Sequence, residues 1–135
     1  MNKEVFNALP RISVGLVYLL WGVDKFINME RYISWISITW RVRIFIDPLM
    51  DIPTFTTLLG IFEVSLGLIL IIGLLTKVSS GLVVLSSILF LFLAGPPMSY
   101  PQDIALFGVG LWMFVNGPDR YSLDYYRVRL GKPNR

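Results

Sequence analysis

The feature that most constrains this chain is a run of twenty-five residues, Val78 to Gln102, without a charged side chain. A second apolar stretch, Thr54 to Thr76, carries one charge, the carboxylate of Glu63. An uncharged apolar run of about 18 residues or more is typical of a membrane span. Only 16% of all residues are charged, against about 25% in a typical soluble domain. These observations exclude a soluble enzyme, a nucleic-acid-binding domain and a disordered tail. They predict one domain in contact with a lipid bilayer.

The sequence contains no cysteine and no histidine. Disulfides, thiol catalysis and the common haem and zinc ligands are therefore excluded. We expect no cofactor bound covalently or through a metal.

Apolar stretches and helix-breaking residues predict four helices. Pro10 suits a first helical turn, Gly95-Pro96-Pro97 would end the third helix, and Gly117-Pro118 would end the fourth. No small-residue cleavage site follows the first apolar segment, so we expect it to be a retained helix. The predicted fold is all-α, a four-transmembrane-helix bundle with an interfacial first loop and a basic cytoplasmic surface tail. The predicted ranges are about 9–26, 54–75, 78–94 and 103–116 for the helices and 117–135 for the tail.

The segment 27–53, between the first two predicted helices, is polar and aromatic. It contains Trp35 and Trp40, and tryptophan concentrates at membrane interfaces. Residues 36–44 alternate apolar and polar side chains, which indicates a strand. A short interfacial helix also fits. Because a lone strand would need a partner, a helix or an irregular re-entrant cap is favoured, and the sequence leaves the conformation open.

Four spans would place both termini on the same side of the membrane. That side would carry Lys3, Arg11, Lys77, Arg120, Arg127, Arg129, Lys132 and Arg135, and the other side Lys25, Arg31, Arg41 and Arg43. Positive charge concentrates on cytoplasmic flanks. The sequence therefore predicts a multi-pass protein of the plasma membrane with both termini in the cytoplasm.

Charges and glycines share faces of the predicted helices, because they recur at spacings of three and four residues. Small residues allow helices to approach closely in a bilayer, which predicts a tight, buried seam between the first two helices. The shared faces are Arg11, Gly15, Tyr18, Gly22 and Lys25 on the first helix, Gly60, Glu63 and Gly67 on the second, and Asp103, Phe107, Gly110 and Phe114 on the fourth.

Glu63 lies nine residues, ~13 Å, along the second predicted helix. Lys25 can reach it by extending its side chain along the helix, and Arg11 is the alternative partner if the helices are offset. Such a pair can simply fix helix register, or Glu63 can serve as a proton-accepting or quinone-contacting carboxylate. Arg11, Lys25, Glu63 and Asp103 are thus candidates for a buried polar cluster.

Three blocks of this sequence resemble the DoxX family of four-helix membrane proteins. The first is Arg11 and Gly15 followed by WGVDKF, the second is GIFE with Gly67, Gly73 and Thr76, and the third is DIALFGVGLWMFVNGPDRYSLD, residues 103–124. The resemblance implies a four-helix bundle with both termini cytoplasmic and an association with redox chemistry. A related branch, the DoxD type, includes a membrane subunit of thiosulfate:quinone oxidoreductase. The absence of cysteine argues against direct thiosulfate oxidation here.

Within GPDRYSLD, Ser122 or Asp124 can cap a short surface helix, and Arg120 can meet lipid headgroups or Asp124. The alternative is a docking surface for a cytoplasmic partner formed by these three residues.

We expect a small accessory membrane subunit of a respiratory or quinone-linked oxidoreductase complex, packed against larger membrane subunits. It would have no redox cofactor of its own and would not be catalytic by itself. The alternatives are a stand-alone quinone-reactive component, in which Glu63, Lys25 and Asp103 move protons, and a lipid-binding protein with a pocket under the aromatic loop.

Overall fold

The computed structural model describes residues 3–94 and 100–130, with side chains except those of residues 3–7, 94 and 100. The predicted stop at Gly95-Pro96-Pro97, and Lys132 and Arg135 of the tail, lie outside the described residues. Within those ranges the chain is all-α and contains no strand. The helices are α1 (Lys3–Ile27), α2 (Met29–Ile38), α3 (Trp40–Ile46), α4 (Ile52–Ile72), α5 (Thr76–Ala94), α6 (Tyr100–Asn116) and α7 (Leu123–Leu130).

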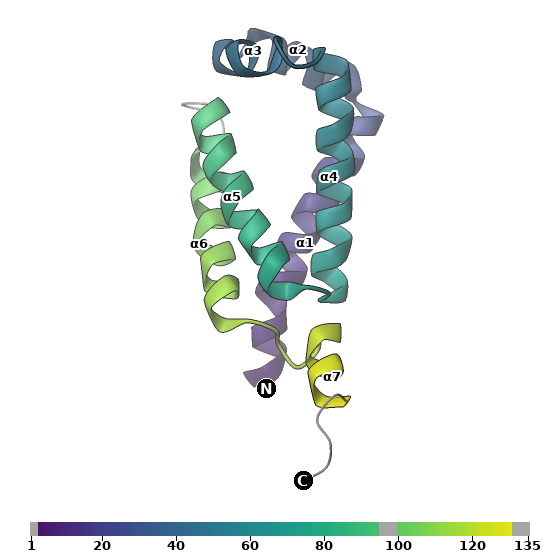
Figure 1. The fold of residues 1–135 in the computed structure, drawn as a ribbon, viewed down its shortest axis with the longest axis vertical. Helices are drawn as coiled ribbons and strands as arrows, with labels where there is room; N and C mark the ends of the chain where they lie inside the picture. Colours follow the sequence, from purple (N-terminus) through teal and green to yellow (C-terminus); the bar gives the residue numbers. More distant parts are fainter. Residues whose placement is uncertain (1–2, 95–99, 131–135) are drawn as a thin grey trace.

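Two antiparallel helix pairs form the body of the molecule. Helix α1 packs along α4, α5 packs along α6, and contacts between the two pairs are fewer (Figure 1). Helices α2 and α3 lie across one end of the pairs, while α7 lies at the opposite end, near the start of α1 (Figure 1). The molecule therefore has a capped end, at α2 and α3, and an end where both chain termini lie.

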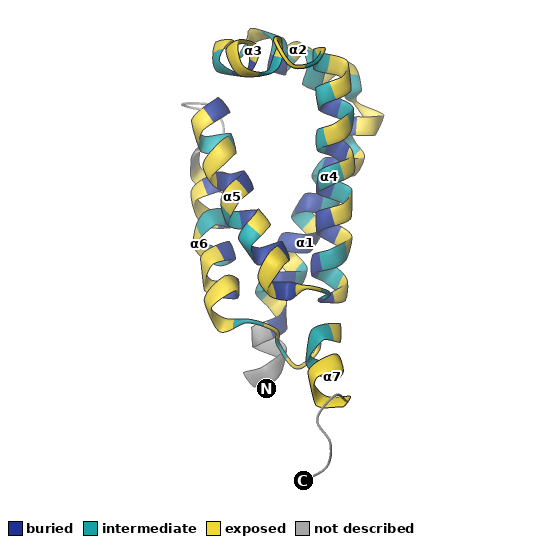
Figure 2. Cartoon of the chain, in the orientation of Figure 1, coloured by how far each residue is buried: buried dark blue, intermediate teal, exposed yellow. Residues whose placement is uncertain are grey.

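The buried side chains form two apolar clusters between these elements. The larger lies between the helix pairs, and the smaller joins α2, α3 and α5 beneath the cap. Outward faces of the long helices remain exposed and apolar (Figure 2), as expected for helices that contact lipid. The larger cluster comprises Val14, Tyr18, Leu66, Leu70, Val83, Leu106 and Met113, and the smaller Ile36, Val42 and Leu93.

Local signals explain the bounds of α4. Asp51 caps its start, where its carboxylate accepts a hydrogen bond from the Thr54 N–H at 3.0 Å. Gly73 ends it in the left-handed region, at φ 74°. The helix therefore spans 52–72 instead of the predicted 54–75, and α5 begins at Thr76, two residues earlier than predicted.

The first helix begins earlier than the sequence predicted. Pro10 lies inside α1 instead of in its first turn, because the helix already begins at Lys3. Helix α6 likewise begins at Tyr100, before the predicted start at residue 103.

The segment 27–53 forms two short helices, so the alternation over residues 36–44 does not produce a strand. The helices meet at Thr39, whose backbone is extended at φ −85° and ψ 97°. Ile36 and Val42 turn inward on either side of this break and are 2% and 4% exposed. Helices satisfy their backbone hydrogen bonds locally, whereas a lone strand would leave its own unpaired.

Helix α4 and residues 76–93 of α5 are each long and apolar enough to cross a membrane. Helices α1 and α2 meet the same criterion only together, with a bend of 97° between them. Helix α6 has 17 residues. By length and composition the described residues therefore contain two spans, or three if the bent pair counts as one.

Candidate functional site

A cavity of about 310 Å³ lies beneath the cap, between the two helix pairs. Its walls combine aromatic and aliphatic side chains with a few ionisable ones. The lining residues come from α1, α2, α3, α4, α5 and α6. They are Trp21, Lys25, Tyr32, Trp35, Ile36, Val42, Phe55, Leu59, Glu63, Phe90, Leu93, Gln102 and Asp103.

Lys25 and Glu63 form a buried ion pair in this cavity. Lys25 Nζ donates to Glu63 Oε2 at 2.6 Å, and the two residues are 6% and 1% exposed. Lys25 Nζ also lies 4.6 Å from the centre of the Tyr32 ring, within the range of a cation–π contact. Because each charge loses its hydration here, removing one partner would leave the other buried and uncompensated.

Asp103 brings a second carboxylate to the same cavity from α6. It is 3% exposed, and it belongs to the first turn of its helix. Carboxylates near a helix N-terminus are stabilised by the helix dipole. The cavity thus contains two acidic groups and one basic group, contributed by three different helices.

Tyr18 lies below these charges, toward the middle of the bundle. Its hydroxyl shares a hydrogen bond of 2.7 Å with Ser86 of α5. Its ring packs against Trp21 with 6.2 Å between centres. Tyr18 therefore links the two helix pairs directly under the cavity.

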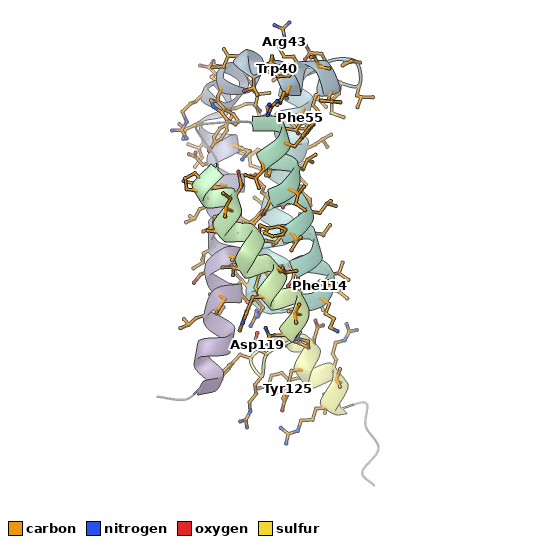
Figure 3. The ribbon with its side chains drawn as sticks, turned by 90° about the vertical axis from the view of Figure 1, so that its left-hand side faces the viewer. Trp40, Arg43, Phe55, Phe114, Asp119 and Tyr125 are labelled. Atoms are coloured by element: carbon orange, nitrogen blue, oxygen red, sulfur yellow. The ribbon has the colours of Figure 1, made fainter. Side chains whose placement is uncertain are left out.

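Arg11 lies apart from this group, at the end of the molecule where the termini lie. Its Nε donates to Asp119 Oδ2 at 2.6 Å, and its Nη1 donates to the carbonyl oxygens of Leu70 and Ile71. Figure 3 shows Asp119 at this end, far from Trp40 and Arg43 in the cap. Lys25, Glu63 and Asp103 thus line one cavity, whereas Arg11 pairs with Asp119 at the other end of the molecule. The prediction that Arg11 belongs to the same polar cluster is therefore wrong.

Glycines of α1 and α4 pack against each other's backbones. A Cβ atom at Gly67 would lie 2.7 Å from Gly15 O, and one at Gly22 would lie 2.9 Å from Gly60 O. Gly110 of α6 packs instead against Val83 of α5, at 2.8 Å from the position of an added Cβ. The close approach of α1 and α4 brings Lys25 within reach of Glu63.

Ser122 and Asp124 form caps at the end where the termini lie. Ser122 is fully buried, and its hydroxyl accepts from the Tyr125 N–H at 3.3 Å in the first turn of α7. The Asp124 carboxylate accepts from the N–H groups of Leu75 and Thr76, at 3.0 and 2.6 Å. Arg120 is exposed. Because Ser122 is buried and its hydroxyl caps α7, this hydroxyl is not part of an exposed docking surface.

Asp124 lies outside the apolar helices and binds backbone donors. Partial burial raises the pKa of this carboxyl, but the hydrogen bonds from Thr76 and Leu75 outweigh that effect. The pKa of Asp124 is therefore lowered below its ordinary value of 3.8.

Sequence reasoning missed Asp119 and the aromatic walls of the cavity. Asp119 follows the helix stop at Gly117-Pro118 and is separated from Arg11 by more than one hundred positions, so no periodicity connects them. Trp21 and Phe90 carry ordinary packing signals in the sequence. Only their convergence with Lys25 and Glu63 distinguishes them.

The model of the DoxX family matches residues 6–96. This range covers most of α1 and all of α2 to α5, and with them Lys25 and Glu63, but ends before Asp103. No curated protein and no solved structure matches the chain. Because the family match covers more than half of the sequence, and the helices it covers are apolar enough for a bilayer, the chain belongs to the DoxX family of membrane proteins.

Proposed function

We propose that this protein binds a quinone headgroup in the cavity beneath the cap, as a membrane subunit of a quinone-linked oxidoreductase complex. The observation that supports this best is the composition of the cavity. Aromatic walls surround a buried Lys25–Glu63 ion pair and a second carboxylate, Asp103. A flat ring with polar atoms on its edge matches these surroundings.

The size of the cavity agrees with such a ligand. A volume of about 310 Å³ lies at the lower end of the range for small-molecule sites. The rings of Trp21, Trp35 and Phe90 offer faces for stacking. Lys25 and Gln102 carry N–H groups that can donate to a ring carbonyl.

The carboxylates supply proton exchange. When a quinone becomes a quinol it takes up as many protons as electrons, and Glu63 and Asp103 are the proton carriers that line the cavity. Lys25 holds Glu63 in place, at 2.6 Å. The electrons come from a partner subunit, since the sequence contains neither cysteine nor histidine to hold a haem or an iron–sulfur cluster.

We further propose that α1, α4, α5 and α6 all cross the plasma membrane. In this arrangement the capped end faces outward and the termini face the cytoplasm. Lys77, Arg120, Arg127 and Arg129 then lie on the cytoplasmic flank, as the distribution of positive charge favours.

Tryptophan fluorescence tests quinone binding directly. Trp21 and Trp35 line the cavity, whereas Trp40 and Trp112 do not. In a variant with Trp40 and Trp112 replaced by Phe, the remaining fluorescence comes from Trp21 and Trp35. We expect a soluble quinone analogue to quench this fluorescence. The further substitution Leu59→Phe, which narrows the cavity without adding a fluorophore, or Glu63→Gln with Asp103→Asn, should weaken this quenching, while Asp47→Asn on the surface should not. Equal quenching in all variants would refute the site.

Purification in a mild detergent tests the partnership. We expect subunits of an oxidoreductase to co-migrate with the protein and to be identified by mass spectrometry. If a species of this chain alone binds quinone and no such subunit is recovered under any mild condition, the accessory role is wrong although the binding site stands.

A further inference from the structure

A second apolar groove lies on the outside of the cap, where α3 meets the end of α5. It has a volume of about 590 Å³. Its lining residues are Trp40, Arg41, Ile44, Phe45, Leu91 and Phe92. Val42 and Leu93, the chain neighbours of Arg41 and Phe92, line the central cavity instead. The α3–α5 contact is therefore a wall that separates two different spaces.

Among the described residues, Arg41 is the only charged one that lines this groove. Its Nη1 donates to the Phe92 carbonyl oxygen at 3.0 Å, and its guanidinium carbon lies 5.2 Å from the centre of the Trp40 ring and 6.0 Å from that of Phe92. Within the described part of the chain, no carboxylate lies within ion-pair distance of Arg41. Its positive charge is thus held in position without a matching negative charge.

Arg43, two residues away, provides a contrast within the same short helix. Its Nε pairs with Asp47 Oδ2 at 3.2 Å, its side chain is 61% exposed, and it does not line the groove. The two arginines have equal formal charge, but only Arg41 combines that charge with an apolar surface.

The apolar part of the groove continues along the membrane-facing side of α5. Phe45 and Phe92 pack against each other with 5.7 Å between ring centres, and they remain 50% and 55% exposed. Trp40 is 63% exposed beside them. These residues lie where the apolar stretch 76–93 of α5 ends, which is the depth at which tryptophan and arginine meet headgroups.

We propose that this groove binds an anionic phospholipid. The phosphate of the lipid lies against the guanidinium of Arg41, which has donors left after its bond to Phe92. One acyl chain lies over Phe45, Phe92 and Leu91. A free phosphate ion would use only the charge and leave this apolar surface exposed, so the combination of both features favours the intact lipid. The site is separate from the proposed quinone cavity, and either can fail without the other.

Native mass spectrometry of the purified full-length protein in detergent provides the test. The probes are phosphatidylglycerol, phosphatidylcholine with the same acyl chains, and glycerol 3-phosphate. We expect the protein to retain phosphatidylglycerol in preference to phosphatidylcholine and not to retain glycerol 3-phosphate. Arg41→Gln should weaken retention about fivefold, the effect of one surface arginine on an anionic lipid, and the control Arg43→Gln should leave it unchanged.

A second variant separates the apolar contribution from the charge. Phe45→Ala removes an exposed ring that is not needed for the buried core, and it should also weaken retention of phosphatidylglycerol. The proposal is overturned if Arg41→Gln and Arg43→Gln behave alike, if the two lipids bind equally, or if glycerol 3-phosphate binds as well as the lipid.

Discussion

Arg11 and Lys25 are both buried cations of α1, and their positions toward opposite ends of the helix give them different partners. The side chain of each suits the partner that it has. Lys25 has a flexible stem and a compact charge, which allows it to bind a single carboxylate oxygen of Glu63 inside a cavity. Arg11 has a planar fork of donors, and it uses them on Asp119 and on two carbonyl oxygens at the end of α4. The lysine therefore suits a site that exchanges protons, and the arginine suits a fixed junction.

The Arg11–Asp119 ion pair should contribute much less to the free energy of unfolding than the cost of removing either residue alone suggests. We expect Arg11→Met or Asp119→Leu alone to lower the free energy of unfolding by about 3 kcal/mol, because each leaves one buried charge uncompensated. The double variant should lose clearly less than the sum of the two. Thermal unfolding of the four proteins in one detergent measures this, and strictly additive losses would contradict the pairing.

Glu63 should be less replaceable than an exposed acid of the same charge. Glu63→Ala removes the carboxylate that pairs with the buried Lys25 ammonium, and we expect a loss of about 3 kcal/mol in the free energy of unfolding. Asp47→Ala removes only a surface partner of Arg43 and should cost less than about 1 kcal/mol. The same unfolding measurement compares the two, and similar losses would show that the Lys25–Glu63 pair is not buried in solution.

At the scale of helices, the glycine spacing and the apolar runs were sufficient to predict that α1 packs closely on α4. That prediction works because both signals are local and periodic. The conformation of α2 and α3 was not predictable, since residues 36–44 alternate like a strand, whereas only Ile36 and Val42 among their apolar members are buried. Both are buried in a cluster with Leu93, which is far along the chain. The partner of Arg11 was not predictable either, because Asp119 is distant from it in the sequence.

The α1–α4 seam should be sensitive to a single methyl group. A Cβ at position 67 would lie 2.6 Å from the backbone nitrogen of Leu19, so Gly67→Ala must push the helices apart, and we expect a loss of about 2 kcal/mol. Gly108→Ala is the matched control, because an added Cβ there has nothing within 4 Å. That variant should be neutral or stabilising, since alanine favours helix. Unfolding temperatures that fall equally in both variants would contradict the close seam.

Asp124 ties α7 to the turn between α4 and α5, and its contribution should depend on pH. Its pKa is lowered in the folded protein, so the stabilisation is complete above the ordinary value of 3.8 and is lost as the pH falls through the folded pKa. At neutral pH, Asp124→Ala should cost about 1 kcal/mol in the free energy of unfolding, as for a lost helix cap.

Unfolding measured from pH 6 down to about pH 3 tests the direction of this effect. The difference in stability between the native protein and Asp124→Asn should shrink as the pH falls, because protonation removes the charge that the amide lacks. A difference that grows toward low pH would show that the pKa is raised instead.

For the whole molecule, the question is how many helices cross the bilayer. Length and hydropathy identify α4 and α5, and α1 with α2 as a bent pair, whereas α6 has only 17 residues. Yet α6 packs along α5 and contributes Asp103 to the central cavity. A helix that runs antiparallel to a span along its length shares the depth of that span, which is why we place α6 in the membrane.

Single-cysteine variants test this arrangement, because the chain has no cysteine of its own. We expect cysteines at Ser34 and Gln102 to react with a membrane-impermeant maleimide added to intact cells, and cysteines at Lys77 and Asn116 to react only after permeabilisation. All four positions are exposed, so differences in labelling report the membrane and not burial. Labelling of Gln102 and Asn116 from the same side would show that α6 does not cross. Complete reversal of the pattern would leave the four spans intact but place the capped end, with the cavity and Arg41, on the cytoplasmic side.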